Sequence, residues 1–315
     1  MARPERALLL MCALALVAAC PARGGSTALC PAAAVDVQAQ ALYAADAEPN
    51  VVQLDARQRL AVVSIYGPGG PELGLCTGTL VAPRWVLTAA HCQALPATQI
   101  AFGADAFDPL LRSSVVRAVQ HPMLDLMLLE LAQPELVAAL GIGPLAWRVS
   151  PDEDALRSEH AQLAGFGLTE GGAAGRLLFA DEPIIDVDAQ ALKVDGAQAG
   201  GACLGDSGGP LLVAQDGEPV LIGALSSGAA DCQGIDRYTR LAAAWPWLAA
   251  VIDQAPALDL ACDAHSGRTQ CVEGHVATSC ESGQLRAADC TRRCVSTDMP
   301  QSCRACSAPK PSRTP

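Results

Sequence analysis

The 315-residue sequence is poor in aromatic side chains and in basic charge. Only 3% of its residues are Phe, Trp or Tyr, so its core must come largely from aliphatic residues, many of them alanine. The 21 Lys and Arg residues are outnumbered by 33 Asp and Glu residues, which leaves a net charge of −12. This balance argues against nucleic acid as a partner and is typical of a solvated acidic surface. It does not identify a substrate.

The sequence also offers little for crossing a membrane. Its apolar N-terminal stretch, Ala7–Ala19, follows Arg3 and Arg6 and is too short to span a bilayer comfortably. We predict a signal peptide over residues 1–19. The small residues before Cys20 resemble a bacterial lipobox, so the exported chain is expected to be either a cell-envelope lipoprotein, attached to the membrane through a lipid on Cys20, or freely secreted with an incidental cysteine. Both destinations favour disulfides.

The most informative run in the chain is Gly205-Asp206-Ser207-Gly208-Gly209-Pro210. Glycines around a serine permit the unusual dihedrals of a turn that exposes one hydroxyl and aims backbone N–H groups at a developing oxyanion. Taken alone, the run could equally be a glycine-rich surface loop. Two upstream motifs favour the catalytic interpretation.

His91 and Asp125 are the partners that a serine nucleophile needs. His91 lies in Leu87-Thr88-Ala89-Ala90-His91-Cys92, and Asp125 interrupts the apolar run Leu124-Asp125-Leu126-Met127-Leu128-Leu129. The serine needs an imidazole to take its proton, and the imidazole needs a carboxylate to fix its tautomer and offset its charge. A carboxylate within an apolar, strand-like run is costly without a partner. We therefore expect Asp125 to pair with His91.

The order His91, Asp125, Ser207 resembles that of trypsin/chymotrypsin-type serine proteases, here an exported bacterial member, whereas other serine hydrolases order their triads differently. The resemblance implies that Ser207 is the nucleophile, His91 the general base and acid, and Asp125 the orienting carboxylate. The amides of Gly205 and Ser207 would form the oxyanion hole. It further implies an endopeptidase that cleaves proteins or peptides through an acyl-enzyme, as a monomer without cofactor or metal.

The same resemblance implies two disulfides. Cys76, sixteen residues before Cys92, matches the bridge that closes the loop carrying the histidine. Cys203 and Cys232 match the bridge from the segment before the nucleophile to a wall of the substrate pocket. In the chain-entropy model, closing a loop of the first size stabilises a fold by about 3 kcal/mol.

Short apolar or β-branched runs broken by Gly and Pro turns follow from Val51 onward, for example Ala61–Tyr66 and Pro219–Gly223. They predict a mostly antiparallel β-protein of barrel or sandwich type. The resemblance, which covers residues 42–254, specifies an all-β fold of two packed antiparallel six-stranded β-barrels, with the site between them and a short C-terminal helix over Trp245–Asp253. We place the protease domain at 48–254, after a linker or pro-segment at 20–47.

The last segment, residues 255–315, is a small cysteine-rich module. Its seven cysteines stand among few large apolar residues, so disulfides rather than a core should hold it together. The pairs Cys290-x3-Cys294 and Cys303-x2-Cys306 could instead bind zinc. Because seven is odd and Cys30 is the unassigned cysteine left in the exported chain, a bridge from Cys30 to the tail is a further hypothesis.

By resemblance, the primary specificity pocket is lined by Gly201, Ala202, Ser226 and Gly228, with Asp236 at its base. The family position for a lysine- or arginine-selecting aspartate is Gly201, so that charge is missing. On a strand, Asp236 and Tyr238 share one face and Arg237 lies on the other. Asp236 could therefore enter the pocket from a second wall and favour basic side chains. Alternatively, it pairs with a surface arginine or turns outward.

Activation is the least regular part of the resemblance. In the family, a newly cut N-terminus folds inward to pair with the aspartate that corresponds to Asp206, but no matching start is present. Asn50-Val51-Val52-Gln53 and Ala41–Ala45 are the nearest candidates, and neither follows a basic residue. Either another protease activates the chain, or Asp206 is satisfied internally. A catalytically silent binding module at the cell surface is the alternative to an enzyme.

Overall fold

The computed structural model describes residues 52–93, 98–147, 156–157, 159–196, 200–262, 270–272 and 276–289. All of them belong to one of the chain's two compact units, Ala32–Pro315. The predicted signal peptide, Cys20, Cys30 and the four cysteines from Cys290 to Cys306 lie outside the described residues, so the hypotheses on them stay predictions. Within the described ranges, no helix is both long enough and apolar enough to cross a bilayer.

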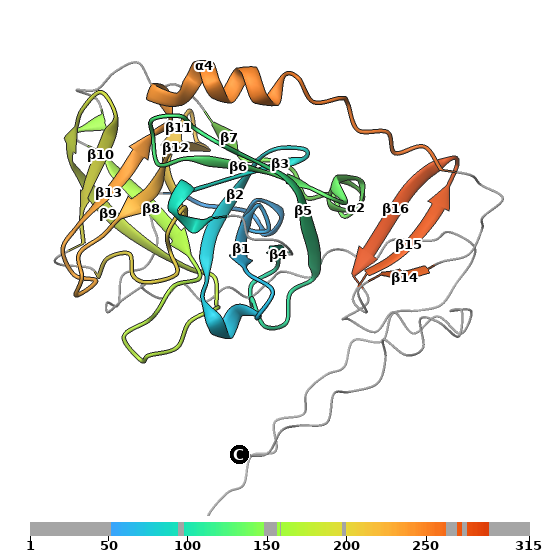
Figure 1. Cartoon of the computed structure of the whole chain (residues 1–315), viewed down its shortest axis with the longest axis horizontal. Coiled ribbons are helices and arrows are strands. Elements are labelled where there is room, and N and C mark those ends of the chain that lie inside the picture. The colour runs from blue at the N-terminus through green and yellow to red at the C-terminus, as the bar shows by residue number, and fades with distance from the viewer. Residues whose placement is uncertain are drawn as a thin grey trace, which may run out of the picture. The chain divides into compact units, whose positions relative to one another are not determined.

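The first half of the protein is a closed six-stranded barrel (Figure 1). Its strands are β1 (Val62–Tyr66), β2 (Cys76–Ala82), β3 (Trp85–Thr88), β4 (Gln99–Phe102), β5 (Leu111–Gln120) and β6 (Met127–Leu131). They pair in the order β1-β2-β3-β6-β5-β4, and the antiparallel pairing of β1 with β4 closes the barrel. All five residues of β1 are buried. This strand begins one residue inside the predicted run and follows from its β-branched, apolar composition.

The second half is another barrel. Its strands are β8 (His160–Gly165), β9 (Leu178–Val187), β10 (Ala191–Asp195), β11 (Pro210–Gln215), β12 (Glu218–Ser227) and β13 (Ile235–Arg240). They pair in the order β11-β8-β9-β10-β13-β12, and β11 with β12 closes the ring. A two-residue strand from the connection between the barrels, β7 (Ala146–Trp147), adds in parallel to β12. One hydrophobic cluster includes Leu87 of the first barrel and Leu221 of the second, so the barrels pack together.

Short helical elements complete the protease region. They are α1 (Ala56–Arg59), η1 (Pro71–Leu73), η2 (Ala90–Cys92), α2 (Pro134–Ala139) and α4 (Leu241–Ile252). The helix α4 is the predicted C-terminal helix, but it begins four residues earlier than expected, directly after β13. The predicted fold class, all-β with two six-stranded barrels and a short C-terminal helix, is confirmed.

Beyond α4 the structure contains a three-stranded antiparallel sheet of β14 (Gln270–Val272), β15 (Val276–Glu281) and β16 (Gln284–Asp289). A disulfide joins Cys262 to Cys280 on β15. This small sheet with its bridge is the kind of structure that a cysteine-rich segment without a large core requires.

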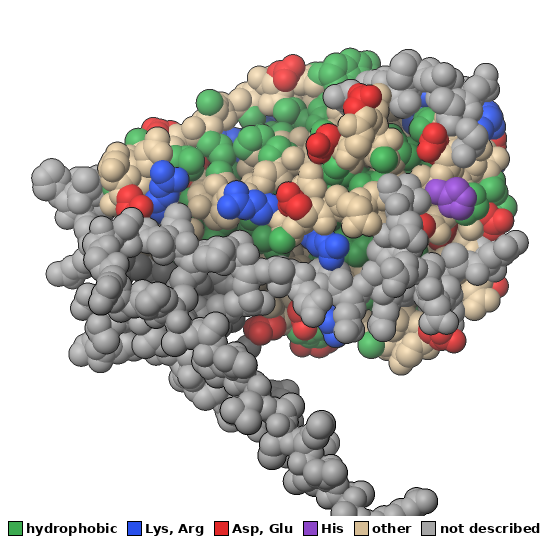
Figure 2. Space-filling model, turned by 180° about the vertical axis from the view of Figure 1, so that it is seen from behind, with side chains coloured by type: hydrophobic (Ala, Val, Ile, Leu, Met, Phe, Trp, Pro, Cys, Tyr) green, Lys and Arg blue, Asp and Glu red, His purple; other side chains and the backbone are tan. Residues whose placement is uncertain are grey.

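Charged side chains on the face drawn in Figure 2 are interspersed with neutral and hydrophobic ones. Acidic groups stand next to Lys and Arg there, as expected when Asp and Glu are scattered along a sequence. On that face, the distribution is typical of a solvated surface.

Phe102 provides a test of the first barrel. Its side chain is completely buried on β4, so Phe102→Ala should reduce the free energy of unfolding by about 3–5 kcal/mol through lost burial and the cavity left behind. Val116→Ala, on the neighbouring strand β5 at 63% exposure, should change it by less than about 0.5 kcal/mol. Denaturant unfolding of both variants measures this. Equal effects would contradict the assignment of Phe102 to the core.

Candidate active site

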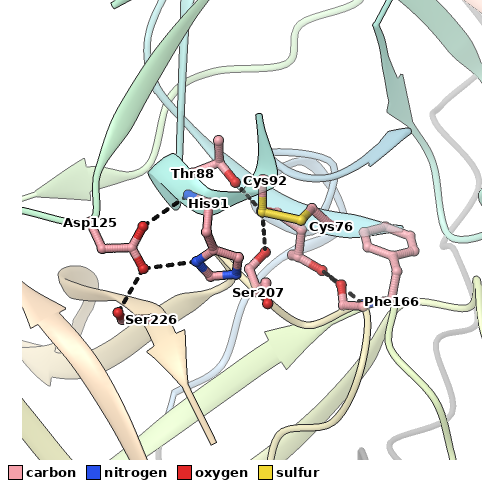
Figure 3. The surroundings of a disulfide bond; sticks show 10 residues. Cys76, Thr88, His91, Cys92, Asp125, Phe166, Ser207 and Ser226 are labelled. Atoms are coloured by element: carbon pink, nitrogen blue, oxygen red, sulfur yellow. Dashed lines mark hydrogen bonds and ion pairs between the residues drawn. A yellow bond between two sulfur atoms is a disulfide. The ribbon is translucent and has the colours of Figure 1, made fainter. Parts of the chain in front are cut away.

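The structure brings His91 and Asp125 together at one end of the first barrel. His91 lies in η2, directly after β3, and Asp125 lies just before β6. Because β3 and β6 pair with Thr88 opposite Met127, the two segments meet. His91 Nδ1 is 2.8 Å from Asp125 Oδ2, and the His91 backbone N–H donates to Asp125 Oδ1 at 3.0 Å (Figure 3).

Asp125 is held by a third donor from the other barrel. The hydroxyl of Ser226, at the end of β12, donates to Asp125 Oδ2 at 2.7 Å. Desolvation acts to raise the pKa of Asp125, but the hydrogen bonds from Ser226 and His91 outweigh it and the pKa is lowered. An ionised carboxylate can only accept hydrogen bonds, so His91 donates from Nδ1, and in the neutral ring Nε2 is then the nitrogen with the lone pair.

Asp125 is less deeply placed than the sequence suggested. Its position in an apolar run predicted a buried strand residue, but the strand β6 begins only at Met127. Its side chain is 27% exposed. The apolar residues after it enter the barrel, whereas Asp125 itself belongs to the preceding turn, and this lets its carboxylate meet donors from two sides.

Ser207 reaches the same site from the second barrel. In Figure 3 the His91 ring lies between the Asp125 carboxylate and Ser207. The structure records no hydrogen bond between this ring and the Ser207 hydroxyl, both of which lie in the described part of the chain. Catalytic contacts of this kind often tighten only when substrate is bound.

Thr77, on β2, fixes the position of the Ser207 turn. Its backbone N–H donates to Ser207 O at 2.8 Å, and its hydroxyl donates to Gly205 O at 2.9 Å. The same hydroxyl accepts from the Phe166 N–H at 3.1 Å, and Thr77 O accepts from the Thr88 hydroxyl at 2.7 Å. Sequence reasoning missed this residue, because threonine is common in strands and no local motif singles it out.

Gly208 shows how closely the turn approaches the first barrel. It has φ of +80°, and a Cβ there would lie 2.1 Å from Thr88 Oγ1 and 2.5 Å from Thr77 O. Only glycine fits both requirements.

The two amides predicted to form the oxyanion hole belong to the same turn. The N–H groups of Gly205 and Ser207 donate to no protein acceptor among the described residues, which leaves both available to a substrate oxygen.

Two disulfides frame the site, in the pairs that the family resemblance implied. Cys76 and Cys92 are bridged, which ties the start of β2 to η2 beside His91. Cys203 and Cys232 are bridged across the segment before Ser207. Cys92 Sγ lies 3.6 Å from Ser207 O. A disulfide sulfur has no hydrogen to donate, so this is a packing contact.

Asp206, beside the serine, is almost fully buried and held by backbone amides. Its Oδ1 accepts from Gly167 N–H at 2.7 Å, and its Oδ2 accepts from Cys203 N–H at 2.9 Å. Desolvation nevertheless raises the pKa of its carboxyl to about 7. Asp206 therefore has hydrogen-bond donors from within the protein, as expected in the alternative in which it is satisfied internally. The N-terminal candidates Ala41–Ala45 and Asn50 lie outside the described residues.

Asp236 lies against the residues expected to line the pocket. Its Oδ2 accepts from the Ala202 N–H at 2.6 Å. A Cβ on Gly201 would lie 2.9 Å from Oδ2, and one on Gly228 would lie 2.4 Å from Oδ1. The side chain is fully buried, so the alternatives of a surface ion pair or an outward orientation are excluded.

The electrostatics of Asp236 follow from this burial. Desolvation raises its pKa to about 6, and the amides of Ala202 and Ala229 lower it in part. Its neighbours alternate as predicted, with Tyr238 buried and Arg237 exposed. Among the described residues, no cluster of three or more His, Cys, Asp or Glu side chains could hold a metal ion.

Glu182, which sequence reasoning did not single out, lies in the same region. Its side chain on β9 is 0% exposed, and neither carboxylate oxygen has a hydrogen-bond partner among the described residues. Desolvation and the charges of Asp236 and Asp195 raise its pKa to about 9. A signal was present, because Glu182 occupies the same alternate positions as the buried residues Leu178 and Ile184.

Comparisons with known proteins agree with this geometry. The family model described as Trypsin matches residues 51–248. Granzyme M of Rattus norvegicus is 31% identical over 209 residues, covering 56% of this chain and 80% of that protein. A trypsin of Simulium vittatum is 32% identical over 183 residues, covering 49% of this chain and 70% of that protein.

The solved structure of HL collagenase supports the fold alone. It matches with a TM-score of 0.54 at 17% identity and covers 66% of this chain and 99% of that one. The family match, which spans more than half of the sequence and contains the His91, Asp125 and Ser207 motifs, is the stronger finding. The chain belongs to the trypsin family of serine endopeptidases.

Proposed function

We propose that this protein is an exported serine endopeptidase in which Ser207 is the nucleophile, His91 the general base and acid, and Asp125 the orienting carboxylate. The observation that carries the proposal is the set of three hydrogen bonds on Asp125, two from His91 and one from Ser226. They keep the carboxylate ionised and the His91 ring in the tautomer that can accept a proton from serine.

The reaction proceeds in two halves. The Ser207 oxygen attacks the scissile carbonyl carbon while its proton passes to His91 Nε2, and the oxyanion is stabilised by the amides of Gly205 and Ser207. The C–N bond breaks as His91 returns the proton to the leaving amine, which leaves an acyl-enzyme on Ser207. Water then loses a proton to His91 and attacks the ester. The acid product departs as Ser207 regains its proton.

The primary pocket would be formed by Gly201, Ala202, Ser226 and Gly228, with Asp236 at its base. Both glycines approach the Asp236 carboxylate so closely that a side chain on either would collide with it. Gly201 stands where the family has its lysine- or arginine-selecting aspartate. The Asp236 carboxylate would supply the missing charge from a second wall, which supports cleavage after lysine or arginine. The cationic side chain would neutralise a buried charge that is costly to leave unpaired.

Export is supported by the disulfides of the structure. Three bridges, Cys76–Cys92, Cys203–Cys232 and Cys262–Cys280, persist in oxidising compartments and are rare in the cytosol. The N-terminal signal and the lipid on Cys20 are further parts of this proposal. The proposed substrates are proteins or peptides.

Fluorophosphonate labelling tests the nucleophile. The purified protein, with and without mild proteolysis to activate it, should form a covalent adduct that peptide mapping assigns to Ser207. Ser207→Ala should lose the adduct and reduce kcat/KM for peptides by about 10⁴-fold or more, because the proton acceptor then has no nucleophile to activate. Ser114→Ala, at an exposed serine on β5, should label normally. A folded protein that does not react in either condition would support a silent binding module instead.

Asp236→Asn tests the specificity. With matched peptides that differ only in arginine or leucine before the scissile bond, the variant should lower the ratio of their kcat/KM values roughly 10²-fold, since a buried counter-charge is lost. The matched control is Asp231→Asn, an exposed aspartate in the loop before β13. It should leave the ratio within about twofold, because solvent screens its charge. A wild-type preference for leucine would contradict the basic specificity.

A further inference from the structure

We propose that Glu182 is a second carboxylate of the primary pocket, behind Asp236, and that it ionises when a cationic substrate side chain enters. This inference rests on the proposed function, in which Asp236 meets that side chain. Four observations carry it: strand register, the approach of the carboxylate to the pocket wall, the lack of a protein partner, and the charges around it.

Strand register places Glu182 on the inner face that carries Asp236. Asp236 on β13 lies opposite Val194 on β10, and Val194 lies opposite Ile184 on β9. Neighbouring residues in such a row share one face of a sheet. Glu182 is two residues before Ile184 and therefore lies on the same face. All four side chains are buried.

The carboxylate of Glu182 approaches the segment that forms the pocket base. A Cβ on Gly196 would lie 3.2 Å from Glu182 Oε1 and 2.7 Å from Gly201 Cα. A Cβ on Gly201 would in turn lie 2.9 Å from Asp236 Oδ2. The two glycines leave room for both carboxylates around one stretch of backbone. Any side chain at either position would fill that room.

Glu182 has no hydrogen-bond partner among the described residues that would explain its burial. Both oxygens lack hydrogen bonds within the described residues, although a buried carboxyl normally has partners. Leaving a buried polar group unsatisfied is costly, and leaving a buried charge unsatisfied costs more. A structural role would be expected to supply donors. A role in binding a donor-rich, cationic side chain instead explains why they are missing.

The charges that face Glu182 are of one sign. Desolvation raises the pKa of Glu182 to about 9, and the charges of Asp236 on β13 and Asp195 on β10 add to this rise. Tyr238, also on β13, is buried, and its pKa is raised by burial and by the charges of Asp236, Glu182 and Asp206. An arriving cation would act on Glu182 with the opposite sign to these two carboxylates. Its entry favours loss of the Glu182 proton.

Binding of a basic side chain should consequently be coupled to proton release. The kcat/KM of an arginine peptide should rise with pH as Glu182 ionises, relative to that of a leucine peptide. The ratio of the two values cancels any effect of pH on the chemical step, which both substrates share. It also cancels the folded fraction of the preparation.

The experiment measures this ratio from pH 6 to pH 10 in the wild type, Glu182→Gln, Asp236→Asn and Glu218→Gln. Glu218 is an exposed carboxylate at the start of β12 and serves as the charge-matched control. We expect the wild-type ratio to rise with pH, and Glu182→Gln to flatten this rise and lower the ratio about tenfold at pH 9. The wild type and Glu182→Gln should converge near pH 6, where Glu182 in the folded protein is protonated and, like glutamine, carries no charge.

Stability provides a second readout that separates binding from structure. The unfolded chain releases the Glu182 proton near pH 4.5, and the folded chain keeps it to about pH 9. The free energy of unfolding should therefore fall as pH rises across this window, and Glu182→Gln should remove that contribution. If the variant changes this pH dependence but leaves the arginine-to-leucine ratio unchanged at every pH, Glu182 is only a buried acid and the proposal is wrong.

The outcomes also separate this proposal from the proposed function. An effect of Asp236→Asn without an effect of Glu182→Gln overturns the second carboxylate and leaves the basic specificity intact. Failure of fluorophosphonate labelling would overturn the enzymatic function itself. An unchanged ratio in Glu182→Gln contradicts the inference whatever the Asp236 variant does.

Discussion

The site depends on the hydrogen bonds of Thr77, because they join the two barrels where the three reactive residues meet. The first barrel carries His91 and Asp125, and the second carries Ser207. Thr77 lies on β2 and binds Ser207 O through its amide and Gly205 O through its hydroxyl, while Thr88 and Phe166 bind Thr77 in turn. Its side chain is fully buried, so these bonds form away from competing water. The adjacent Cys76–Cys92 bridge ties the same strand to η2. The strand β2 therefore anchors both the turn that carries Ser207 and the turn that carries His91.

Four carboxyl groups near the site differ because their donors differ. Asp125 has three donors and partial solvent contact, so its pKa falls despite desolvation. Asp206 has two amide donors but is deeply buried, and its pKa rises to about 7. Asp236 is also buried, and its pKa rises to about 6. Glu182 has no donor among the described residues, and its pKa rises furthest, to about 9. Asp125, the partner of His91, is thus the carboxyl group whose lowered pKa favours the ionised form. Glu182 has the most raised pKa, and in our proposal a cationic substrate side chain would change its protonation.

Much of this arrangement could be predicted from local patterns. The short β-branched runs indicated an antiparallel barrel or sandwich, which the family resemblance narrowed to two barrels. Period-two alternation placed Asp236 and Tyr238 on one face of a strand and Arg237 on the other, and the structure shows that the first face is the buried one. Two kinds of information were missing. The depth of Asp125 depends on where β6 begins, which an apolar run does not define. The nearness of Glu182 to Asp236 depends on β10 lying between their strands, and strand order is a long-range property that no segment of sequence contains by itself.

Asp206 connects the fold to the question of activation. Its carboxylate accepts one amide hydrogen at each oxygen, which leaves lone pairs on both. Glycines at 165 and 167 make room for it, since a Cβ at either would lie 2.0 or 2.4 Å from its oxygens. Two amides already orient the group, but they do not offset the cost of burying its charge, as the raised pKa shows. An ammonium group that reached Asp206 would offset that cost and hold the carboxylate ionised at neutral pH. The backbone of the Ser207 turn would then be fixed by a charge pair in addition to the amides, so the same burial that destabilises the unpaired acid would strengthen its pairing.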